Sequence, residues 1–376
     1  MRLLYLMTEP FGVGGVQSDL LQLTEDLSAR GHQVYVATTD GVLLQELIDR
    51  GAHFVDIDFH FRDPIRLFAA MCRLRKVVRR ERIELIAPQS VRSALAAWAA
   101  LRLIPRGFRG TGGKRLPIVT TIHNIHNPKN FRLASNILQR CSDYVIFESH
   151  YERDRQLQHA LSPDKSGVIH SGIDIERLTA PTATEQFAAR YGIEPGRHFV
   201  FGIVARLSEE KGHHYLVDAF ARVAQQRPEL RLLIVGDGPL RGAINAQVDA
   251  LKIKSQIIFT GLQRDIPSHL ALFDVFTLAS TRESFPLAAR EAMAAGRAVI
   301  APRIGGCPEV VEEDVTGLLF EAANVDDLAA KMQALAADRE ICRRFGEAGH
   351  QRAQRRFSRQ SWVDGDEKVY LQWVRA

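Results

Sequence analysis

Cysteine is scarce in this sequence and scattered along it. The four cysteines are Cys72, Cys141, Cys307 and Cys342, and no two of them form a Cys-x-x-Cys pair. Such spacing argues against a zinc cluster and against a disulfide framework, and it is typical of proteins in a reducing compartment. We therefore expect a cytoplasmic protein.

Long apolar runs are also missing. No run approaches the ~20 apolar residues that span a bilayer, and the apolar start, Met1 to Met7, is too short for a signal peptide. The composition is that of an ordinary globular chain, with 46% hydrophobic and 25% charged residues. A chain of 376 residues is too long for one compact core, which favours two domains.

Strand-like and helix-like segments alternate, which predicts parallel sheets with crossover helices. Expected strands cover residues 3–7, 33–38, 53–57, 83–87, 117–122, 144–147, 166–170, 198–204, 230–235, 256–260, 274–279 and 298–301. The pattern restarts near residue 198. We therefore predict an α/β fold of two Rossmann-like doubly wound domains whose strand ends can face each other across a cleft.

The expected domain boundaries follow from composition. The first domain covers 1–180 and the second 197–357, joined by a polar linker at about 179–196 that contains Pro181 and Pro195. A last helix, 358–376, carries Trp362 and Tyr370, and we expect it to pack back on the first domain.

The most informative stretch is 280–291, which follows a strand-like run and opens a helix. Pro286 suits the first helical position, and Ser284 can help to cap it. Glu283 then lies in the loop and Glu291 about two turns into the helix, so the two acids can reach different parts of one elongated ligand. Free N–H groups at the helix start favour an anion nearby. The alternative is an ordinary solvated pair of glutamates.

A second cluster lies in the loop after the strand 198–204. Arg206 and Lys211 can converge on one anion, with Gly212 allowing the chain to bend. Arginine offers a planar fork for phosphate and lysine a compact charge, so a diphosphate site is favoured over two unrelated surface cations. Gly236 begins a tight turn at the next strand end, suited to lying near a nucleobase.

The first domain offers ligand candidates at its own strand ends. Gly14 and Gly15 follow the first strand without forming a Gly-x-Gly-x-x-Gly motif, so they favour close approach of a ligand over a dinucleotide site. Gln17 lies just beyond them. His123 and Asn124 follow the strand 117–122, where α/β folds place ligands. The alternative for His123 is a satisfied core histidine. No set of His, Asp and Glu shows metal-binding spacing in the sequence.

A basic stretch lies between Arg62 and Arg115. It contains fourteen lysines and arginines but only three acids. Such a surface could meet an anionic acceptor, an anionic membrane or nucleic acid, or could simply be a solvated helix. Few aromatic residues are interleaved, so nucleic acid is disfavoured.

As a set, these residues resemble a known family, the retaining GT-B glycosyltransferases of family GT4. The matching pieces are Gly14-Gly15-Val16, the run Val168 to Asp174, Arg206 with Lys211-Gly212, Gly236 to Pro239, Glu283 with Glu291, and Gly305-Gly306 with Glu309. The resemblance covers residues 12 to 320. The chain departs from the family pattern at Ser284, Arg290, Ala298 and His170-Ser171, which bears on the identity of the sugar.

The resemblance implies a role for each site residue. The catalytic residues would be His123, Arg206, Lys211 and Glu283. Arg206 and Lys211 would hold the diphosphate of a nucleotide-sugar donor and Glu291 its ribose. Glu283 and the backbone of Ser284, Phe285, Pro286 and Leu287 would hold the sugar hydroxyls, and His123 would lie near the reacting carbon. Further donor contacts would be Gly14, Gly15, Gly236 and Leu262, and acceptor contacts Gln17 and Asn124.

The implied activity is metal-independent transfer of a sugar to a glycan or lipid-linked acceptor, in polysaccharide or glycolipid synthesis. No cofactor beyond the donor substrate is expected. Peripheral contact with an anionic membrane, at its inner face, is a further expectation. Two alternatives stay open: a nucleotide-sugar sensor without transfer activity, and a GT-B-fold sugar-nucleotide epimerase, although no acids and base are visible for an elimination.

Overall fold

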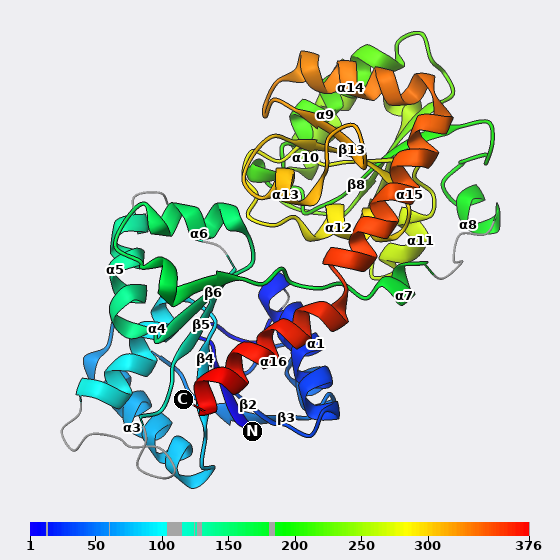
Figure 1. The fold of residues 1–376 in the computed structure, drawn as a ribbon. Helices are drawn as coiled ribbons and strands as arrows, with labels where there is room; N and C mark the ends of the chain where they lie inside the picture. The colour runs from blue at the N-terminus through cyan, green and yellow to red at the C-terminus, as the bar shows by residue number, and fades with distance from the viewer. Residues whose placement is uncertain are drawn as a thin grey trace. The chain divides into compact units, whose positions relative to one another are not determined.

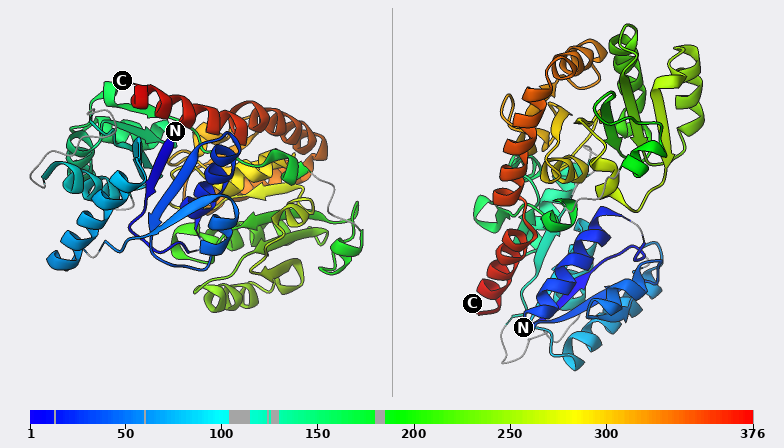
Figure 2. Two further views of the ribbon diagram at one scale, coloured as in Figure 1. Left: turned by 90° about the horizontal axis from the view of Figure 1, so that it is seen from below. Right: turned by 90° about the vertical axis from the view of Figure 1, so that its right-hand side faces the viewer.

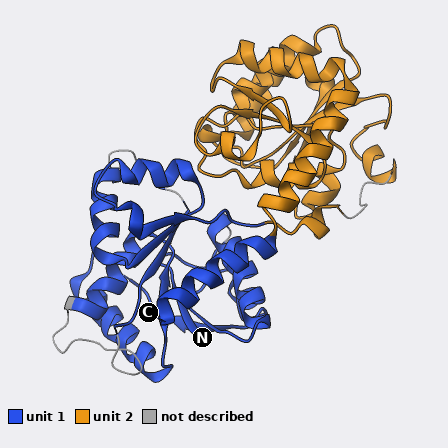
Figure 3. Ribbon diagram, viewed as in Figure 1, with its two compact units in different colours: residues 1–172, 359–376 blue, residues 173–358 orange. Residues whose placement is uncertain are grey.

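The computed structural model describes residues 1–12, 14–59, 61–103, 115–123, 125, 130–179 and 185–375. It contains two compact units, drawn in different colours in Figure 3. Unit 1 comprises Met1–Gly172 with Arg359–Ala376, and unit 2 comprises Ile173–Ser358. Each unit is described here by itself.

The linker predicted at 179–196 is wrong in its described part. Unit 2 begins at Ile173, and the short helix α8 (Glu185–Ala189) and the turn after it belong to that unit. Ala188 and Ile193 are buried in its core. Two apolar side chains therefore anchor a stretch whose overall polarity indicated a free connection.

Unit 1 contains a parallel sheet whose strand order reverses once. Four strands lie in the order β3-β2-β1-β4, and three more lie in the order β5-β6-β7. A parallel bridge between Ile86 and Ile118 joins the two sets. The strands are β1 (Arg2–Leu6), β2 (Gln33–Thr38), β3 (Ala52–Asp56), β4 (Leu85–Pro88), β5 (Val119–Ile122), β6 (Tyr144–Phe147) and β7 (Ser166–Val168). The order therefore changes direction between β1 and β4.

The helices of unit 1 begin where the sequence supplies caps. Asp63 accepts hydrogen bonds from the N–H groups of Ile65 and Arg66 at the start of α3, with Pro64 in the first turn, and Ser90 forms a capping box with Ser93 at α4. The helices are α1 (Gly15–Ala29), α2 (Leu44–Asp49), α3 (Pro64–Arg80), α4 (Val91–Trp98) with a π-helical turn (Ala99–Leu103), α5 (Phe131–Cys141) and α6 (His150–Leu157). Helix α1 starts directly in the glycine loop, with Gly14 as its N-cap residue.

Unit 2 repeats this arrangement with one six-stranded parallel sheet. Its order is β10-β9-β8-β11-β12-β13, so the direction changes between β8 and β11. The strands are β8 (Phe199–Val204), β9 (Leu230–Val235), β10 (Ile257–Gly261), β11 (Val275–Thr277), β12 (Ala298–Pro302) and β13 (Gly317–Phe320). The sequence did not indicate β13.

Helices cover both faces of this sheet. Alternate residues of β8 enter different cores: Phe199, Phe201 and Ile203 join one, and Val200 joins the other. Side chains on both faces are buried, as parallel sheets require. The helices are α7 (Ile175–Thr179), α9 (His213–Ala224), α10 (Arg241–Ala250), α11 (Ile266–Leu270), α12 (Leu287–Ala294), α13 (Cys307–Val310), α14 (Val325–Ala337) and α15 (Arg339–Arg356). The predicted class, two doubly wound α/β units, is confirmed (Figure 1).

The last helix, α16 (Arg359–Arg375), lies on unit 1 beside α1, as Figures 1 and 2 show. Trp362 and Tyr370 are buried in the same core as Tyr5 of β1. Charged pairs fix the helix at its edges: Arg359 contacts Asp26 and Glu25, and Glu367 contacts Arg30 and His32. The C-terminal end of the chain thus completes the N-terminal unit. None of the described helices combines the length and apolar character needed to cross a bilayer.

We predict that Trp362→Ala destabilises unit 1 by about 3–5 kcal/mol, because it leaves a cavity where a large buried side chain packed. Thermal unfolding followed by calorimetry measures the change. Lys368→Ala, on the exposed side of the same helix, is the matched control and should stay within about 0.5 kcal/mol of the parent. Equal unfolding temperatures for Trp362→Ala and the parent would contradict the docking of α16.

Candidate functional site

The candidate residues of unit 2 lie at the carboxyl ends of its strands. The loop after β8 carries Arg206 and Lys211, and the loop after β11 carries Glu283. These two strands are neighbours at the point where the strand order reverses, so their following segments leave the sheet in opposite directions. Open parallel sheets place their ligand crevices at this point.

An ion pair connects these two loops. The Nζ atom of Lys211 lies 2.7 Å from Oε1 of Glu283, and the hydroxyl of Ser280 donates to the same oxygen, also at 2.7 Å. The Glu283 side chain is only 10% exposed, and that of Lys211 is 28% exposed. The structure thus brings together two residues that the sequence separates by 72 positions, as a single site requires.

Arg206 lies in the same loop as Lys211 but differs in its surroundings. Its side chain is exposed, and it makes no hydrogen bond or ion pair with any other residue that the structure describes. Lys211 already has a carboxylate partner, whereas Arg206 keeps its whole guanidinium fork for an incoming anion.

Glycines let the surrounding loops pack backbone against backbone. Gly305 has φ +54°, and a Cβ atom there would lie 1.6 Å from the carbonyl oxygen of Glu283. Gly236 has φ +136°, and a Cβ there would lie 2.1 Å from the carbonyl oxygen of Ala205. Any side chain at either position would displace the loop that carries a candidate residue. The neighbouring Leu262, which follows β10, is 83% exposed.

The start of α12 differs in detail from the prediction. Pro286 is the N-cap residue, not the first helical residue, and its own side chain makes no cap hydrogen bond. The chain is extended at Pro286, with ψ 109°, which delays the helix until Leu287. The Phe285 ring packs against Phe357 with a centroid distance of 5.6 Å, which leaves its backbone as the part suited to a ligand.

Glu291 lies inside α12, as expected from its spacing. Burial raises the pKa of Glu291 to about 7, although Arg290 and Arg177 act in the opposite direction. A carboxyl group with this pKa is held in a site that opposes its charge, and strongly perturbed groups of this kind cluster at functional sites. Two hydroxyl donors from a ligand would supply the hydrogen bonds that the carboxylate lacks in a dry site.

Unit 1 has its own group of candidates at the reversal between β1 and β4. Gly14 and Gly15 connect β1 to α1, and a Cβ atom on Gly15 would meet nothing within 4 Å, so space is open there. A Cβ on Gly14 would lie 2.5 Å from Oε1 of Gln17, which places the Gln17 side chain over that glycine. Asn124, the other predicted acceptor contact, lies outside the described residues.

His123 follows β5 and is held by several side chains. Its Nδ1 atom lies 2.7 Å from Oε1 of Glu148 and 3.8 Å from Oδ2 of Asp19, and its Nε2 lies 3.1 Å from Oε1 of Gln89. Burial lowers the pKa of His123, but Glu148 and Asp19, with Asp366 of α16, outweigh it and raise the pKa to about 9. The ion pair thus stabilises unit 1 fully below pH 6.5, and this contribution is lost as the pH rises through 9.

The sequence did not single out Gln89, Glu148 or Asp19. Gln89 and Glu148 each follow a parallel strand directly, as His123 does, so the rule that selected His123 could have found both. In the structure, a carboxylate oxygen of Asp19, a ring nitrogen of His123 and a carboxylate oxygen of Glu148 all lie within 4.8 Å of one another. The spacing of these residues along the chain did not indicate this cluster. Because Nδ1 of His123 already donates to Glu148, we interpret these three residues as an ion-paired cluster.

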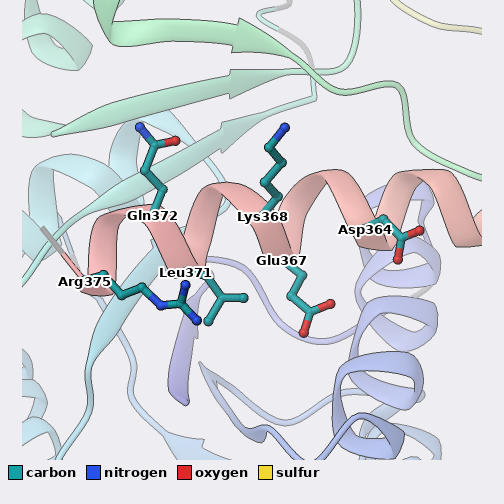
Figure 4. Close-up of a pocket in the computed structure, with 6 residues that line it drawn as sticks. All are labelled: Asp364, Glu367, Lys368, Leu371, Gln372 and Arg375. Carbon is teal, nitrogen blue, oxygen red and sulfur yellow. The ribbon is translucent and has the colours of Figure 1, made fainter.

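Two surface hollows lie elsewhere on the molecule. One runs along α16 and is shown in Figure 4, where the side chains that line it all come from that single helix: Asp364, Glu367, Lys368, Leu371, Gln372 and Arg375. The other lies near the end of α9 and the start of β10. No predicted site residue lines either hollow, so neither enters the argument for function.

Comparison with known proteins agrees with the geometry of both units. Residues 186–352 match the family described as glycosyl transferases group 1, and residues 13–177 match glycosyltransferase family 4. The chain is 26% identical to N-acetyl-alpha-D-glucosaminyl L-malate synthase of Bacillus anthracis, over 96% of this chain and 95% of that protein. It is 24% identical to alpha-monoglucosyldiacylglycerol synthase of Streptococcus pneumoniae, over 90% and 82%.

Among solved structures, the fold is similar to that of HepE from Anabaena in complex with UDP-glucose. The TM-score is 0.83 at 23% identity, and the match covers 99% of this chain and 100% of that one. The matching families and the fold define a glycosyltransferase with the GT-B architecture. The chain belongs to the group 1 glycosyltransferases of family GT4.

We predict that Lys211 and Glu283 depend on each other. Lys211→Met should destabilise unit 2 by about 1–3 kcal/mol, because it leaves the Glu283 carboxylate buried without its cation. Adding Glu283→Gln to Lys211→Met should recover part of this loss. Denaturant unfolding of both single variants and the double variant measures the coupling. Strictly additive losses would show that the two side chains do not stabilise each other.

Proposed function

We propose that this protein is a retaining, metal-independent glycosyltransferase that moves a sugar from a nucleotide-diphosphate sugar to a glycan or lipid-linked acceptor. The observation that carries the proposal is Arg206, an exposed cation without a described partner, beside the Lys211–Glu283 pair at the strand-order reversal of unit 2. A diphosphate would give Arg206 the bidentate partner that it lacks.

The catalytic roles follow from where charge develops. Glycosyl transfer passes through an oxocarbenium-like state, in which negative charge accumulates on the departing diphosphate. Arg206 and Lys211 would stabilise that charge more strongly in the transition state than in the bound donor. These two cations would supply the neutralisation that Mg²⁺ supplies in other enzymes. Retention would follow from attack on the leaving-group face, with the leaving phosphate accepting the proton of the acceptor hydroxyl.

Other residues would hold the donor in place. The partly buried Glu291 would accept hydrogen bonds from two ribose hydroxyls, and the turn at Gly236 would lie against the base. Glu283 and the backbone at the start of α12 would bind the sugar hydroxyls, and His123 would also contact the sugar. Relatives support a nucleotide-sugar donor, since HepE was solved with UDP-glucose. A relative named for a glucosyldiacylglycerol supports a lipid-linked acceptor.

A sensor without transfer activity would also need a nucleotide-sugar site. It would not need the Lys211–Glu283 pair directed at the reacting part of the donor. An epimerase of the same fold would need an acid and a base placed for elimination. The described residues of unit 2 show no second unpaired acid–base set at the carboxyl ends of β8 and β11, so transfer is the better proposal.

The test begins with thermal shifts in the presence of a panel of nucleotide-diphosphate sugars, followed by transfer assays with the donor that binds. Arg206→Ala should lower kcat/KM at least about tenfold, because a charge-assisted hydrogen bond contributes roughly 1.5–3 kcal/mol. Arg197→Ala is the matched control, since Arg197 is an exposed arginine just ahead of β8, at the opposite edge of the sheet. Activity should persist in EDTA, and the product should keep the anomeric configuration of the donor.

Unchanged kinetics in a folded Arg206→Ala variant would remove the donor-site assignment. Activity that EDTA abolishes and Mg²⁺ or Mn²⁺ restores would remove the metal-independent mechanism. Inverted product stereochemistry would remove retention while leaving the donor site in place.

We also propose that α3 binds unit 1 to the cytoplasmic face of an anionic membrane, where a lipid-linked acceptor would lie. Ile65 is 82% exposed and Phe68 56% exposed on the first turns of this helix. Exposed cations follow them along the same helix: Arg66, Arg73, Lys76, Arg79 and Arg80. Arg75, which the sequence grouped with these cations, is buried and donates to the carbonyl oxygen of Ala100, so it is not part of this surface.

Membrane binding by this surface should depend on both charge and apolar contact. Each basic residue near an anionic surface contributes about 1 kcal/mol, screened by salt. We predict that Lys76→Glu with Arg79→Glu weakens co-sedimentation with anionic liposomes and raises the acceptor KM, leaving the donor KM unchanged. Lys252→Glu with Lys254→Glu, an equal charge change on exposed lysines of unit 2, is the control and should bind normally. Failure of the parent protein to bind anionic liposomes at low salt would end this proposal.

A further inference from the structure

Both ring nitrogens of His123 face hydrogen-bond acceptors. Nδ1 lies 2.7 Å from a carboxylate oxygen of Glu148, and Nε2 lies 3.1 Å from the amide oxygen of Gln89. A neutral imidazole carries only one N–H proton. Its other ring nitrogen would then present a lone pair to an acceptor oxygen, which is unfavourable. Only the doubly protonated imidazolium can donate at both positions.

The orientation of the Gln89 amide is fixed by a second contact. Its Nε2 atom donates to the carbonyl oxygen of Ala87 at 3.1 Å. Rotating the amide by half a turn would place its oxygen against that carbonyl oxygen, two acceptors facing each other. Gln89 is only 6% exposed, so water cannot easily replace the lost bond. The oxygen of Gln89 therefore faces His123, and Nε2 of His123 must carry a proton.

We propose that Glu148 and Asp19 are positioning residues that hold His123 as an imidazolium cation. Gln89 accepts the hydrogen bond from the Nε2–H group of His123 until a hydroxyl of the donor sugar replaces Gln89 as the acceptor. This inference rests on the proposed function, in which His123 contacts the donor sugar. Gln89 acts as the resting acceptor, so the buried N–H is not left unpaired when no donor is bound.

The cluster is assembled from separate elements of unit 1. Asp19 comes from α1, Glu148 follows β6, and Gln89 follows β4. From α16, Asp366 adds a carboxyl group, and burial raises the pKa of Asp366 to about 7. The Tyr5 and Tyr370 hydroxyls, 3.5 Å apart, lie in the same core and stay neutral, because burial raises the pKa of each.

The charges of this cluster suit the chemistry. The imidazolium of His123 lies beside the carboxylates of Asp19 and Glu148, and Asp366 adds a negative charge when it ionises. Carboxylates near a sugar carbon would stabilise the positive charge that grows on it in the transition state. The His123 proton at the same time fixes one sugar hydroxyl. The carboxylates would thus orient the histidine and offset its charge.

The first experiment measures the protonation state directly. In protein labelled with ¹⁵N in its histidines, the His123 ring signals are assigned by their loss in His123→Gln. We expect imidazolium shifts at both nitrogens of His123 at pH 7.5. In Glu148→Gln, which keeps an acceptor but removes the charge, the transition should move at least about one pH unit lower. Glu152→Gln, a buried glutamate on the adjacent helix α6, is the matched control and should leave the signals unchanged.

The second experiment follows the pH dependence of kcat. The parent enzyme should keep its rate up to about pH 8.5, and Glu148→Gln should lose at least about fivefold there while recovering at pH 6, where its histidine is protonated. A merely structural role for Glu148 would lower the rate equally at all pH values. Gln89→Leu should lower the donor KM, since the donor then meets no competing acceptor.

Three results would overturn the inference: a neutral His123 ring at pH 7.5, a His123 transition that Glu148→Gln does not move, or ring signals that EDTA alters, which would assign the cluster to a metal ion. The proposed function fails differently, through the absence of sugar transfer by the parent protein with any donor, whereas normal transfer by His123→Gln would remove only the role of His123. In that case the ring signals would still report whether the imidazolium exists.

Discussion

Both candidate sites of this protein depend on one constraint of parallel sheets. Where the strand order reverses, the loops that follow two neighbouring strands separate and leave space between them. Between β8 and β11, and again between β1 and β4, consecutive strands in space send their following segments to opposite faces of the sheet. The strand ends are left open there and lined by polar groups on two sides. Lys211 and Glu283 meet at one reversal. Asp19 and Gln89 lie on the segments that follow β1 and β4 at the other, and His123 and Glu148 directly follow the next two strands, β5 and β6.

The two sites stabilise their partly buried charges with similar sets of partners. Each pairs a cation with a carboxylate at 2.7 Å, and each adds a neutral side chain as a further partner, Ser280 in unit 2 and Gln89 in unit 1. Removing charges from water is costly, so such pairs are retained where they serve function and not for stability alone. In both sites, the charged side chain is already paired with a side chain of its own unit.

Much of this architecture could be predicted because it depends on local patterns. Short apolar runs with turn residues between them located most of the strands, and the spacing of Glu283 and Glu291 placed one acid in a loop and the other in α12. The errors arise where tertiary contacts decide. Ala188 and Ile193 tie a polar stretch to unit 2, and the extended chain at Pro286 shifts the start of α12. The His123 cluster draws on four separate segments, so no spacing in the sequence could display it.

The position of α16 has a consequence for the order in which the protein is made. The strands of unit 1 are synthesised before those of unit 2, yet its core includes Trp362, Val363 and Tyr370, which are synthesised after all of unit 2. Unit 2 is continuous in sequence and has everything it needs to fold as soon as it emerges, whereas the first-made unit must wait with an apolar face uncovered. Until the last helix becomes available, unit 1 exposes the apolar face that α16 covers in the folded protein, and in that interval the chain is prone to aggregation and depends most on a chaperone.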